Sequence, residues 1–493
     1  MTEFELKLEI PPQRLPVVLA AMREDKVRSK RLQARYFDTE EEALAHKGIV
    51  LRLRREGRAW VQTAKCAGSG PLERLEHNVL LGASPGAAPP NVSLARHDGT
   101  PVGEKIRQAL GVDSLDRPAT VMPTFETDRL TRSMEHAGSA VEVALDRGKV
   151  RAGTAEAALC ELEFELLEGE PVAAVRLARR WLAAHGLWLS TVSKSAKGRR
   201  LAAGLEFGPP VGAATPHLRR RASGAEIGMA VVRACLDQVL GNASEIGAGS
   251  ADAEHIHQLR VGIRRLRTAL RELSGLAPGA DPAWEAALVD AFRVLGEHRD
   301  HSHLERSMQP QLEAQGAPPL DVRCSQDPPD PTATVRSPAF QDALLGLLEF
   351  THSASATESG NAGFAKARKL LSSRLEKLHS QVGKDGRRFQ QLEMVSQHRV
   401  RKRLKRLRYL AEFVAPLFAP RRGRDFIAAL KPVQDALGLY NDELMALEAY
   451  RRIAEHDPAA WFGVGWLTAR RAGNAAQCQQ ELQRFDKAKP FWR

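Results

Sequence analysis

Short segments of alternating polar and apolar residues dominate roughly the first 200 positions of the chain. Gly, Pro or Asp bounds each segment, as is typical of β-strands. The clearest examples span residues 3–10, 50–57, 59–65, 140–148 and 160–169. Helical periodicity interrupts them at about residues 12–23 and 171–184. The pattern predicts a sheet accompanied by a few helices in this part of the chain.

The chain changes character near residue 205. The segment 204–217 is rich in Gly and Pro, which is typical of a linker. From about residue 224 the periodicity is helical, and clear strand signals disappear. We therefore expect a strand-rich part, a linker and a helical part, in that order.

Charged residues gather on one face of several predicted strands, because residues two apart in a strand share a face. These faces contain Glu3, Glu5, Lys7 and Glu9; Glu161, Glu163 and Glu165; Arg52 and Arg54; and Thr63 and Lys65. A sheet with one solvated face would explain any single strand. Taken together, the grouped carboxylates would suit Mg²⁺, which leaves positions for substrate phosphates. Arginines would suit phosphate oxygens.

The order of these segments resembles the CYTH family, the triphosphate tunnel metalloenzymes. Glu3-Phe-Glu5-Leu-Lys7 matches the ExExK motif that opens the family. The likeness continues through YFDT (36–39), LRLRREG (51–57), WVQTAK (60–65), ALDRG (144–148), CELEFEL (160–166) and SKSAKG (193–198). The resemblance covers about residues 1–203. It implies a closed antiparallel β-barrel whose tunnel holds a triphosphate and divalent metal ions.

The resemblance also implies roles for individual residues. The implied metal ligands are Glu3, Glu5, Glu161, Glu163 and Glu165, and the implied phosphate-binding cations are Lys7, Arg52, Arg54, Lys65 and Lys194. Asp146 resembles an acid near the metals that helps to orient water. Two positions depart from the family or stay open. The RxExE strand appears here as Arg74-Leu-Glu76-His-Asn78, with an amide in place of its last carboxylate. A further tunnel arginine is Arg129 or Arg132, of which we favour Arg132.

The helical part contains an internal repeat. His257, Arg260, Arg264, Arg265, Leu266 and Arg267 recur 141 residues later as His398, Arg401, Lys405, Arg406, Leu407 and Arg408. Leu295-Gly296 and Asp300 recur 142 residues later as Leu437-Gly438 and Asp442. With 3.6 residues per turn, each copy places cations on one stripe and apolar residues on the opposite side. Each helix can therefore bury one face and present a basic face.

An exposed face paired with acids such as Asp300 and Asp442 would explain one such helix. A duplicated row favours a polyanion, because like charges four residues apart repel each other. The repeat resembles the CHAD domain, over about residues 218–485. This resemblance implies two pseudo-symmetric helical bundles with a basic surface associated with inorganic polyphosphate. The predicted polyphosphate-binding residues are His257, Arg260, Arg264, Arg267, His398, Arg401, Lys405 and Arg408.

The charge of the chain agrees with phosphate partners. Its 493 residues include 72 Lys and Arg against 60 Asp and Glu, a net charge of +12. Residues 1–210 carry 31 basic and 28 acidic side chains, so most of the excess lies in the helical part. Aromatic residues make up 5%, which leaves few platforms for base stacking, and nucleic acid is not an expected partner. No apolar run is long enough to span a membrane. Five scattered cysteines without a CxxC motif fit a reducing cytoplasm.

These resemblances imply an α+β protein with a barrel domain at residues 1–203, a linker at 204–217 and an all-α domain at 218–485. They imply an Mg²⁺- or Mn²⁺-dependent inorganic triphosphatase that hydrolyses tripolyphosphate to pyrophosphate and phosphate. Its helical domain would bind long-chain polyphosphate, and we expect it in the cytoplasm, free or at polyphosphate granules. Two alternatives stay open. One is a granule-associated binding protein with little or no catalysis. The other is a thiamine-triphosphatase-like or adenylate-cyclase-like activity in the same tunnel.

Overall fold

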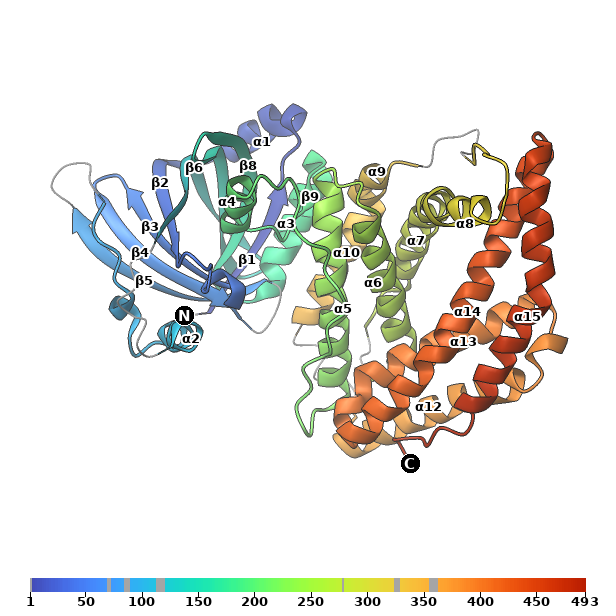
Figure 1. Cartoon of the computed structure of the whole chain (residues 1–493). Coiled ribbons are helices and arrows are strands. Elements are labelled where there is room, and N and C mark those ends of the chain that lie inside the picture. The colour runs from blue at the N-terminus through green and yellow to red at the C-terminus, as the bar shows by residue number, and fades with distance from the viewer. Residues whose placement is uncertain are drawn as a thin grey trace. The chain divides into compact units, whose positions relative to one another are not determined.

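The computed structural model describes residues 2–68, 72–83, 89–111, 120–276, 279–322, 329–353 and 362–493 (Figure 1). Contacts divide the chain into two compact units. The first, called the barrel unit, comprises residues 1–211, 240–250 and 335–353. The second, called the helical unit, comprises residues 212–239, 251–334 and 354–493.

Antiparallel strands close into a barrel in the first unit. Its order is β5-β4-β3-β2-β6-β7-β8-β1, and pairing of β1 with β5 closes the ring, with Glu3 opposite Arg74. The short β9 extends the sheet beside β1. The strands are β1 (Thr2–Glu9), β2 (Arg28–Asp38), β3 (Ile49–Glu56), β4 (Ala59–Ala67), β5 (Glu73–Ala83), β6 (Thr120–His136), β7 (Ser139–Ala152), β8 (Ala155–Glu168) and β9 (Trp188–Leu189). This architecture confirms the predicted closed antiparallel barrel.

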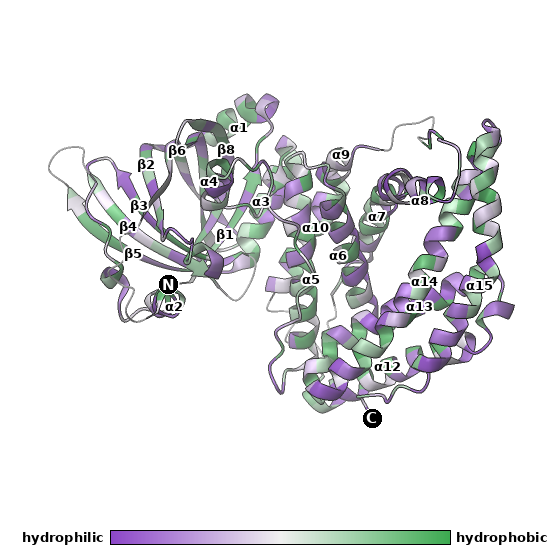
Figure 2. Cartoon of the chain, viewed as in Figure 1, coloured by the Kyte–Doolittle hydropathy of each residue, from purple (hydrophilic) through white to green (hydrophobic). Residues whose placement is uncertain are grey.

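Alternation along the strands separates an apolar outer face from a polar inner face, visible as changing hydropathy along the ribbons in Figure 2. Leu6 on β1 and Leu162 on β8 are fully buried, and helix α3 (Pro171–His185) packs on both strands. Phe164 of β8 meets Trp181 of α3 edge to face, with ring centroids 6.2 Å apart. Since the apolar residues face outward onto helices, the charged residues between them face the barrel interior.

The remaining helices of the barrel unit come from both halves of the sequence. They are α1 (Leu15–Met22), α2 (Pro101–Leu110), α4 (Lys194–Ala202), the end of α5 (Gly224–Gly247) and α10 (Pro338–His352). Arg179 of α3 binds Asp342 of α10 through two hydrogen bonds of 2.5 and 2.6 Å. The predicted boundaries, 1–203, 204–217 and 218–485, follow the chain order. The compact barrel unit additionally recruits residues 240–250 and 335–353.

The helical unit contains only helices and their connections among the residues described, which confirms the all-α prediction. Besides the first part of α5, the helices are α6 (Ala253–Glu272), α7 (Pro282–His303), α8 (Gln309–Glu313), α9 (Pro331–Arg336), α12 (Phe364–Gly386), α13 (Met394–Val414), α14 (Pro420–Ala454) and α15 (Trp461–Phe485). None of the described helices has the length and apolarity needed to cross a bilayer.

The two copies of the repeat, α6 and α13, pack on each other through equivalent residues. Arg265 of α6 lies over the ring of Phe413 of α13, 5.3 Å from its centroid. In return, Arg406 of α13 forms an ion pair with Glu272 of α6. Each residue and its equivalent are 141 positions apart. This reciprocal contact is the geometry expected of a pseudo-symmetric pair of bundles.

Candidate functional site

The barrel unit contains a cavity of about 660 Å³ whose wall is rich in charged side chains. Acidic lining residues include Glu3, Glu5, Glu76, Glu142, Glu163 and Glu165, and basic ones include Lys7, Arg52, Arg54, Lys65, Arg74, Arg129 and Lys194. Nine predicted site residues are among them: Glu3, Glu5, Lys7, Arg52, Arg54, Lys65, Glu163, Glu165 and Lys194. The alternation of the strands therefore brings most of the predicted set together.

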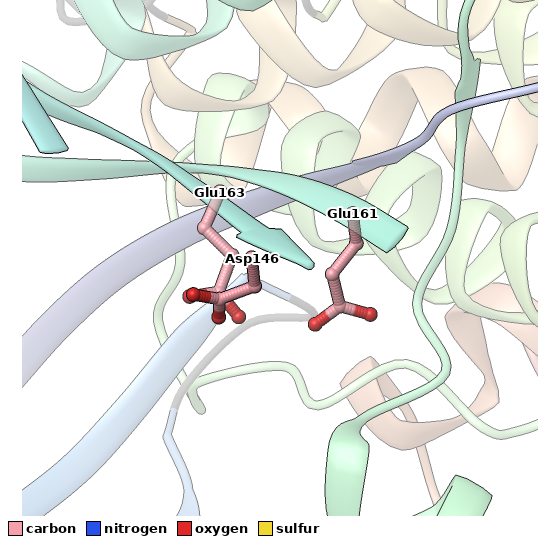
Figure 3. A group of neighbouring side chains, drawn as sticks. All are labelled: Asp146, Glu161 and Glu163. Carbon is pink, nitrogen blue, oxygen red and sulfur yellow. The ribbon is translucent and has the colours of Figure 1, made fainter. Parts of the chain in front are cut away.

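A first group of carboxylates comprises Asp146 on β7 with Glu161 and Glu163 on β8 (Figure 3). One oxygen atom from each lies within 4.8 Å of the others. The Lys194 Nζ atom lies 2.7 Å from Asp146 Oδ2 and 2.6 Å from Glu161 Oε1, and also pairs with Glu163. Arg129 donates hydrogen bonds of 2.7 and 2.6 Å to Asp146 and one of 2.5 Å to Glu163. Protein cations thus balance this group.

These cations set the pKa values of the group. Burial by itself would raise the pKa of Glu161, but Lys194 and Lys7 outweigh burial and lower this pKa to about 2. Against the same effect of burial, Lys194 and Arg129 hold the pKa of Glu163 well below its usual value. Lys197, to which the sequence analysis assigned no role, bridges Glu9 and Glu161 at 2.7 Å each. Lys197 lies three residues after Lys194 and therefore on the same helix face, so the sequence could have indicated that it is near the same carboxylates.

A second group of carboxylates gathers around Lys65. The Lys65 Nζ atom lies 2.7 Å from Glu3 Oε2, 2.6 Å from Glu76 Oε2 and 3.9 Å from Glu5 Oε2. Burial, together with a hydrogen bond to Glu76, raises the pKa of Glu3 to about 9. Burial and repulsion raise the pKa of Glu5 to about 7, and burial raises that of Glu165. In the opposite direction, the hydrogen bond with Glu3 and the charge of Lys65 outweigh burial and lower the pKa of Glu76 to about 2. Three carboxyl groups thus share the single ammonium group of Lys65.

The second group offers carboxylate donors for a divalent cation, but the carboxylates whose oxygens converge within 4.8 Å of one another are Asp146, Glu161 and Glu163 of the first group. Mg²⁺ and Mn²⁺ bind carboxylate oxygens, and such a cation would displace the protons that Glu3 and Glu5 hold near neutral pH. Glu76 and Glu142 share the inner face, although the sequence analysis assigned neither a role. The inward orientation of both residues could have been predicted from strand alternation, because Glu76 is two residues from Arg74 and Glu142 is four residues from Asp146.

Arg129, and not Arg132, faces the cavity, which corrects the preferred prediction. On β6, Arg129 lies opposite Asp146, whereas Arg132 lies opposite Val143, a fully buried residue of the outer face. Arg132 donates a hydrogen bond of 3.0 Å to the carbonyl oxygen of Ala21, outside the barrel. An odd spacing along a strand puts the two arginines on opposite faces. The sequence motif alone did not define which one points inward.

Arg52 and Arg54 place two cations on one stretch of the cavity wall. Repulsion from Arg52, followed by burial, lowers the pKa of Arg54. Asn78 Oδ1 accepts a hydrogen bond of 2.6 Å from Thr63 Oγ1, which in turn accepts one of 3.4 Å from Arg52. The amide at position 78 therefore leaves more of the positive charge of Arg52 unbalanced than a carboxylate would.

Cations from three helices crowd together on the helical unit, forming what we call the basic face: Arg260 and Arg264 of α6, Arg299 of α7, and Arg401 and Lys405 of α13, with His257 and His398 beside them. Burial and repulsion from Arg264 and Arg401 lower the pKa of Lys405 to about 6. Burial and neighbouring cations also lower the pKa of Arg260 to about 10. Asp300 and Asp442 offset this repulsion in part.

Three of the predicted polyphosphate-binding arginines have acidic partners, of which the longest pair joins Arg401 Nη2 to Asp442 Oδ1 at 4.0 Å. Arg267 Nη2 lies 3.2 Å from Glu285 Oε1, and Arg408 Nε lies 2.5 Å from Glu412 Oε1. Arg299 was missed by the sequence analysis. Its equivalent 142 residues later is Asn441, so comparison of the two copies offered no signal for it.

Comparison with known proteins gives two family matches. Residues 1–198 match the family model of the CYTH domain, and residues 230–451 match that of the CHAD domain. The chain is 30% identical over 206 residues to the inorganic triphosphatase of Haemophilus influenzae. The aligned part is 40% of this chain and 54% of that relative, so the chain spans about half the length of the curated relative it matches.

Two solved structures are also similar. The CHAD domain from the plant Ricinus communis is 26% identical with a TM-score of 0.46, over 56% of this chain and 96% of that one. An adenylyl cyclase candidate from Hippeastrum with a dominant triphosphatase activity is 16% identical with a TM-score of 0.31, over 42% of this chain and 97% of that one. On the two family matches, the chain carries a CYTH domain followed by a CHAD domain.

Proposed function

We propose that the barrel unit hydrolyses inorganic triphosphate to pyrophosphate and phosphate with the help of Mg²⁺ or Mn²⁺. The observation that carries this proposal is the pairing, in one cavity, of an undercompensated carboxylate group with a wall of arginines and lysines. The name of the Haemophilus influenzae relative supports the same chemistry.

Glu3, Glu5 and Glu165, together with Glu76, would hold the metal, and Glu161 and Glu163 are further candidate ligands. A divalent cation in such a site neutralises phosphate charge and makes a bound water more acidic. Because these carboxylates lie on neighbouring strands, the metal would be held by the strands of the barrel themselves.

The remaining cavity residues bind and align the substrate. Lys7, Arg52, Arg54 and Lys65 would bind phosphoryl oxygens, and Arg129 replaces Arg132 in this set. Lys194 would turn from its carboxylate partners toward the phosphate chain, which leaves Asp146 able to accept a hydrogen bond from the attacking water. Phosphoryl transfer depends mainly on such positioning and electrostatic stabilisation.

The basic face of the helical unit would bind long-chain polyphosphate. Burial and mutual repulsion depress the pKa of Arg260 and Lys405, and phosphate oxygens would offset the repulsion. Arg267 and Arg408 would contribute less to polyphosphate binding, because each forms a close ion pair with a glutamate. Binding of this kind would also attach the protein to polyphosphate granules.

A phosphate-release screen tests the catalytic proposal. The full chain would be assayed with triphosphate, nucleoside triphosphates, thiamine triphosphate and long-chain polyphosphate, each with Mg²⁺ and with Mn²⁺. We expect triphosphate to be the preferred substrate. Preference for thiamine triphosphate, or cyclic nucleotide formation, would identify the related tunnel activities instead. Tight triphosphate binding without release would identify a binding protein.

A further inference from the structure

Two consecutive residues near the end of α5, Ser244 and Glu245, hold α4 at both ends within the barrel unit. Before α4 begins, Thr191 donates its backbone N–H to Ser244 Oγ at 3.0 Å, and the two hydroxyls lie 3.2 Å apart. At the other end, Arg200 donates hydrogen bonds of 3.0 and 2.5 Å to the two carboxylate oxygens of Glu245. The side chain of Glu245 is 5% exposed, so this charged pair is shielded from water.

The chain after α4 is tied to the same carboxylate. The backbone N–H of Gly208 donates to Glu245 Oε2 at 3.3 Å. A Cβ atom at Gly208 would lie 2.2 Å from Arg200 Nη2, so a larger residue there would displace the guanidinium group. Glu245 thus holds both the last turn of α4 and the segment that follows it.

The need for these anchors comes from what α4 carries. Lys194 and Lys197 extend from its first turn to the carboxylates of β1, β7 and β8. A phosphate chain that draws Lys194 away from Asp146, Glu161 and Glu163 removes three of those ion pairs. The contacts made by Ser244 and Glu245 do not involve Asp146, Glu161 or Glu163 and stay in place, and both Glu245 and Arg200 also line the cavity.

We infer that Ser244 and Glu245 are positioning residues that fix α4, and with it Lys194, for phosphate binding in the barrel. This role rests on the proposed triphosphatase function for its consequence in catalysis. Residues 240–250 lie within the segment that matches the CHAD domain, yet they belong to the barrel unit. The substrate site of the CYTH domain therefore depends on a helix from the CHAD part of the sequence.

The test is Glu245→Gln in the full chain, measured by hydrogen–deuterium exchange and by calorimetric binding of triphosphate without metal. We expect about tenfold faster exchange across α4 and about tenfold weaker triphosphate binding, because two charge-assisted hydrogen bonds lose their charge. Asp342→Asn, on a side chain that is 51% exposed, is the control. It removes the charge from a similar two-bond pair with Arg179 that does not touch α4, and it should change neither measurement.

Exchange across α4 and triphosphate affinity that both match wild type would overturn the inference. The double variant Arg200→Glu with Glu245→Arg should restore much of the lost protection, which a general loss of packing would not allow. If Glu245→Gln does not fold, Ser244→Ala gives the same test at the other end of α4. A wild-type protein without phosphate release would overturn the proposed function, while exchange and binding would still decide the positioning role.

Discussion

The carboxylate group around Lys65 in the barrel cavity and the basic face of the helical unit have opposite local charge imbalances. In the cavity, carboxylates gather around Lys65, and burial raises the pKa of Glu3 to about 9. On the basic face, cations from three helices gather, and burial with repulsion lowers the pKa of Lys405 to about 6. Both regions occur in one chain of net charge +12, so total charge does not distinguish them.

Under the proposed function, the difference corresponds to two kinds of phosphate ligand. The carboxylates around Lys65 would hold a divalent cation, and the neighbouring arginines would bind a short phosphate chain. Excess cationic charge attracts a polyanion directly, without a metal. If this contrast is correct, each region should respond to changes that leave the other unaffected.

Removal of divalent metal should have the largest effect, and only on the cavity. With EDTA present, we expect phosphate release from triphosphate to fall by about 1,000-fold, because charge neutralisation and water activation are both lost. Binding of long-chain polyphosphate to the basic face should be unchanged. Phosphate assays and fluorescence binding on the same sample measure both. Polyphosphate binding that also disappears with EDTA would contradict the contrast.

Glu5→Gln should lower kcat for triphosphate by about 100-fold, because it removes a charge from the undercompensated group at nearly constant shape. Steady-state kinetics at several Mg²⁺ concentrations would measure the change. Glu156→Gln, on the exposed end of β8, is the control and should retain wild-type kinetics. Full activity of Glu5→Gln would remove this residue from the metal site.

Charge reversal on the basic face should weaken the binding of long-chain polyphosphate and leave triphosphate hydrolysis unchanged. Arg264→Glu combined with Lys405→Glu should weaken long-chain polyphosphate binding by about 100-fold, because two side chains that attract phosphate are replaced by two that repel it. The value of kcat/KM for triphosphate should not change. Arg421→Glu combined with Arg422→Glu, both exposed on α14, controls for net charge. If both variants weaken binding equally, the ligand recognises total charge and not this face.

The depressed pKa of Lys405 predicts that polyphosphate binding takes up a proton. Arg264, Arg299 and Arg401 disfavour its charged form and Asp442 favours it, so bound phosphate should raise its pKa. Affinity should therefore fall by up to about tenfold per pH unit as pH rises above 6. The unfolded chain binds this proton up to a higher pH than the folded one, so Lys405 also makes the free energy of unfolding increase with pH above 6.

Calorimetry in buffers of different ionisation enthalpy measures the proton uptake. Lys405→Arg should remove it while keeping the positive charge, because arginine stays protonated throughout this range. Uptake that persists in Lys405→Arg would assign the proton to another group of the face.

Asn78→Glu should have the smallest effect. An added carboxylate near Glu76 should lower the Mg²⁺ concentration for half-maximal activity by about threefold, since it increases the negative charge of the metal-binding group. Metal titrations of the triphosphatase reaction would measure it, with Asn78→Gln as the neutral control. A higher Mg²⁺ requirement would show that position 78 acts on Arg52 and the phosphate, not on the metal.

Much of the fold and of the site could be predicted because both depend on local periodicity. Alternation placed Glu3, Glu5 and Lys7 on one face, and the repeat identified α6 and α13 as equivalent helices. The choice between Arg129 and Arg132 could not be made this way, because it depends on the register of β6 against β7. Arg299 reaches the basic face from α7 through packing, and its repeat equivalent is not basic.

By itself, the sequence determined the strand-rich part, the helical repeat and the faces that carry most of the charged residues of both regions, because strand and helix periods assign side chains to faces. The closed barrel was implied by the resemblance to the CYTH family and not by these periods. The tertiary structure decided how those charges balance. It placed Lys194 among Asp146, Glu161 and Glu163, left Glu3 and Glu5 undercompensated, and brought Glu245 to α4 from a distant part of the chain. The physical reason is that burial and charge–charge distances arise from contacts between residues far apart in sequence, which no local pattern encodes.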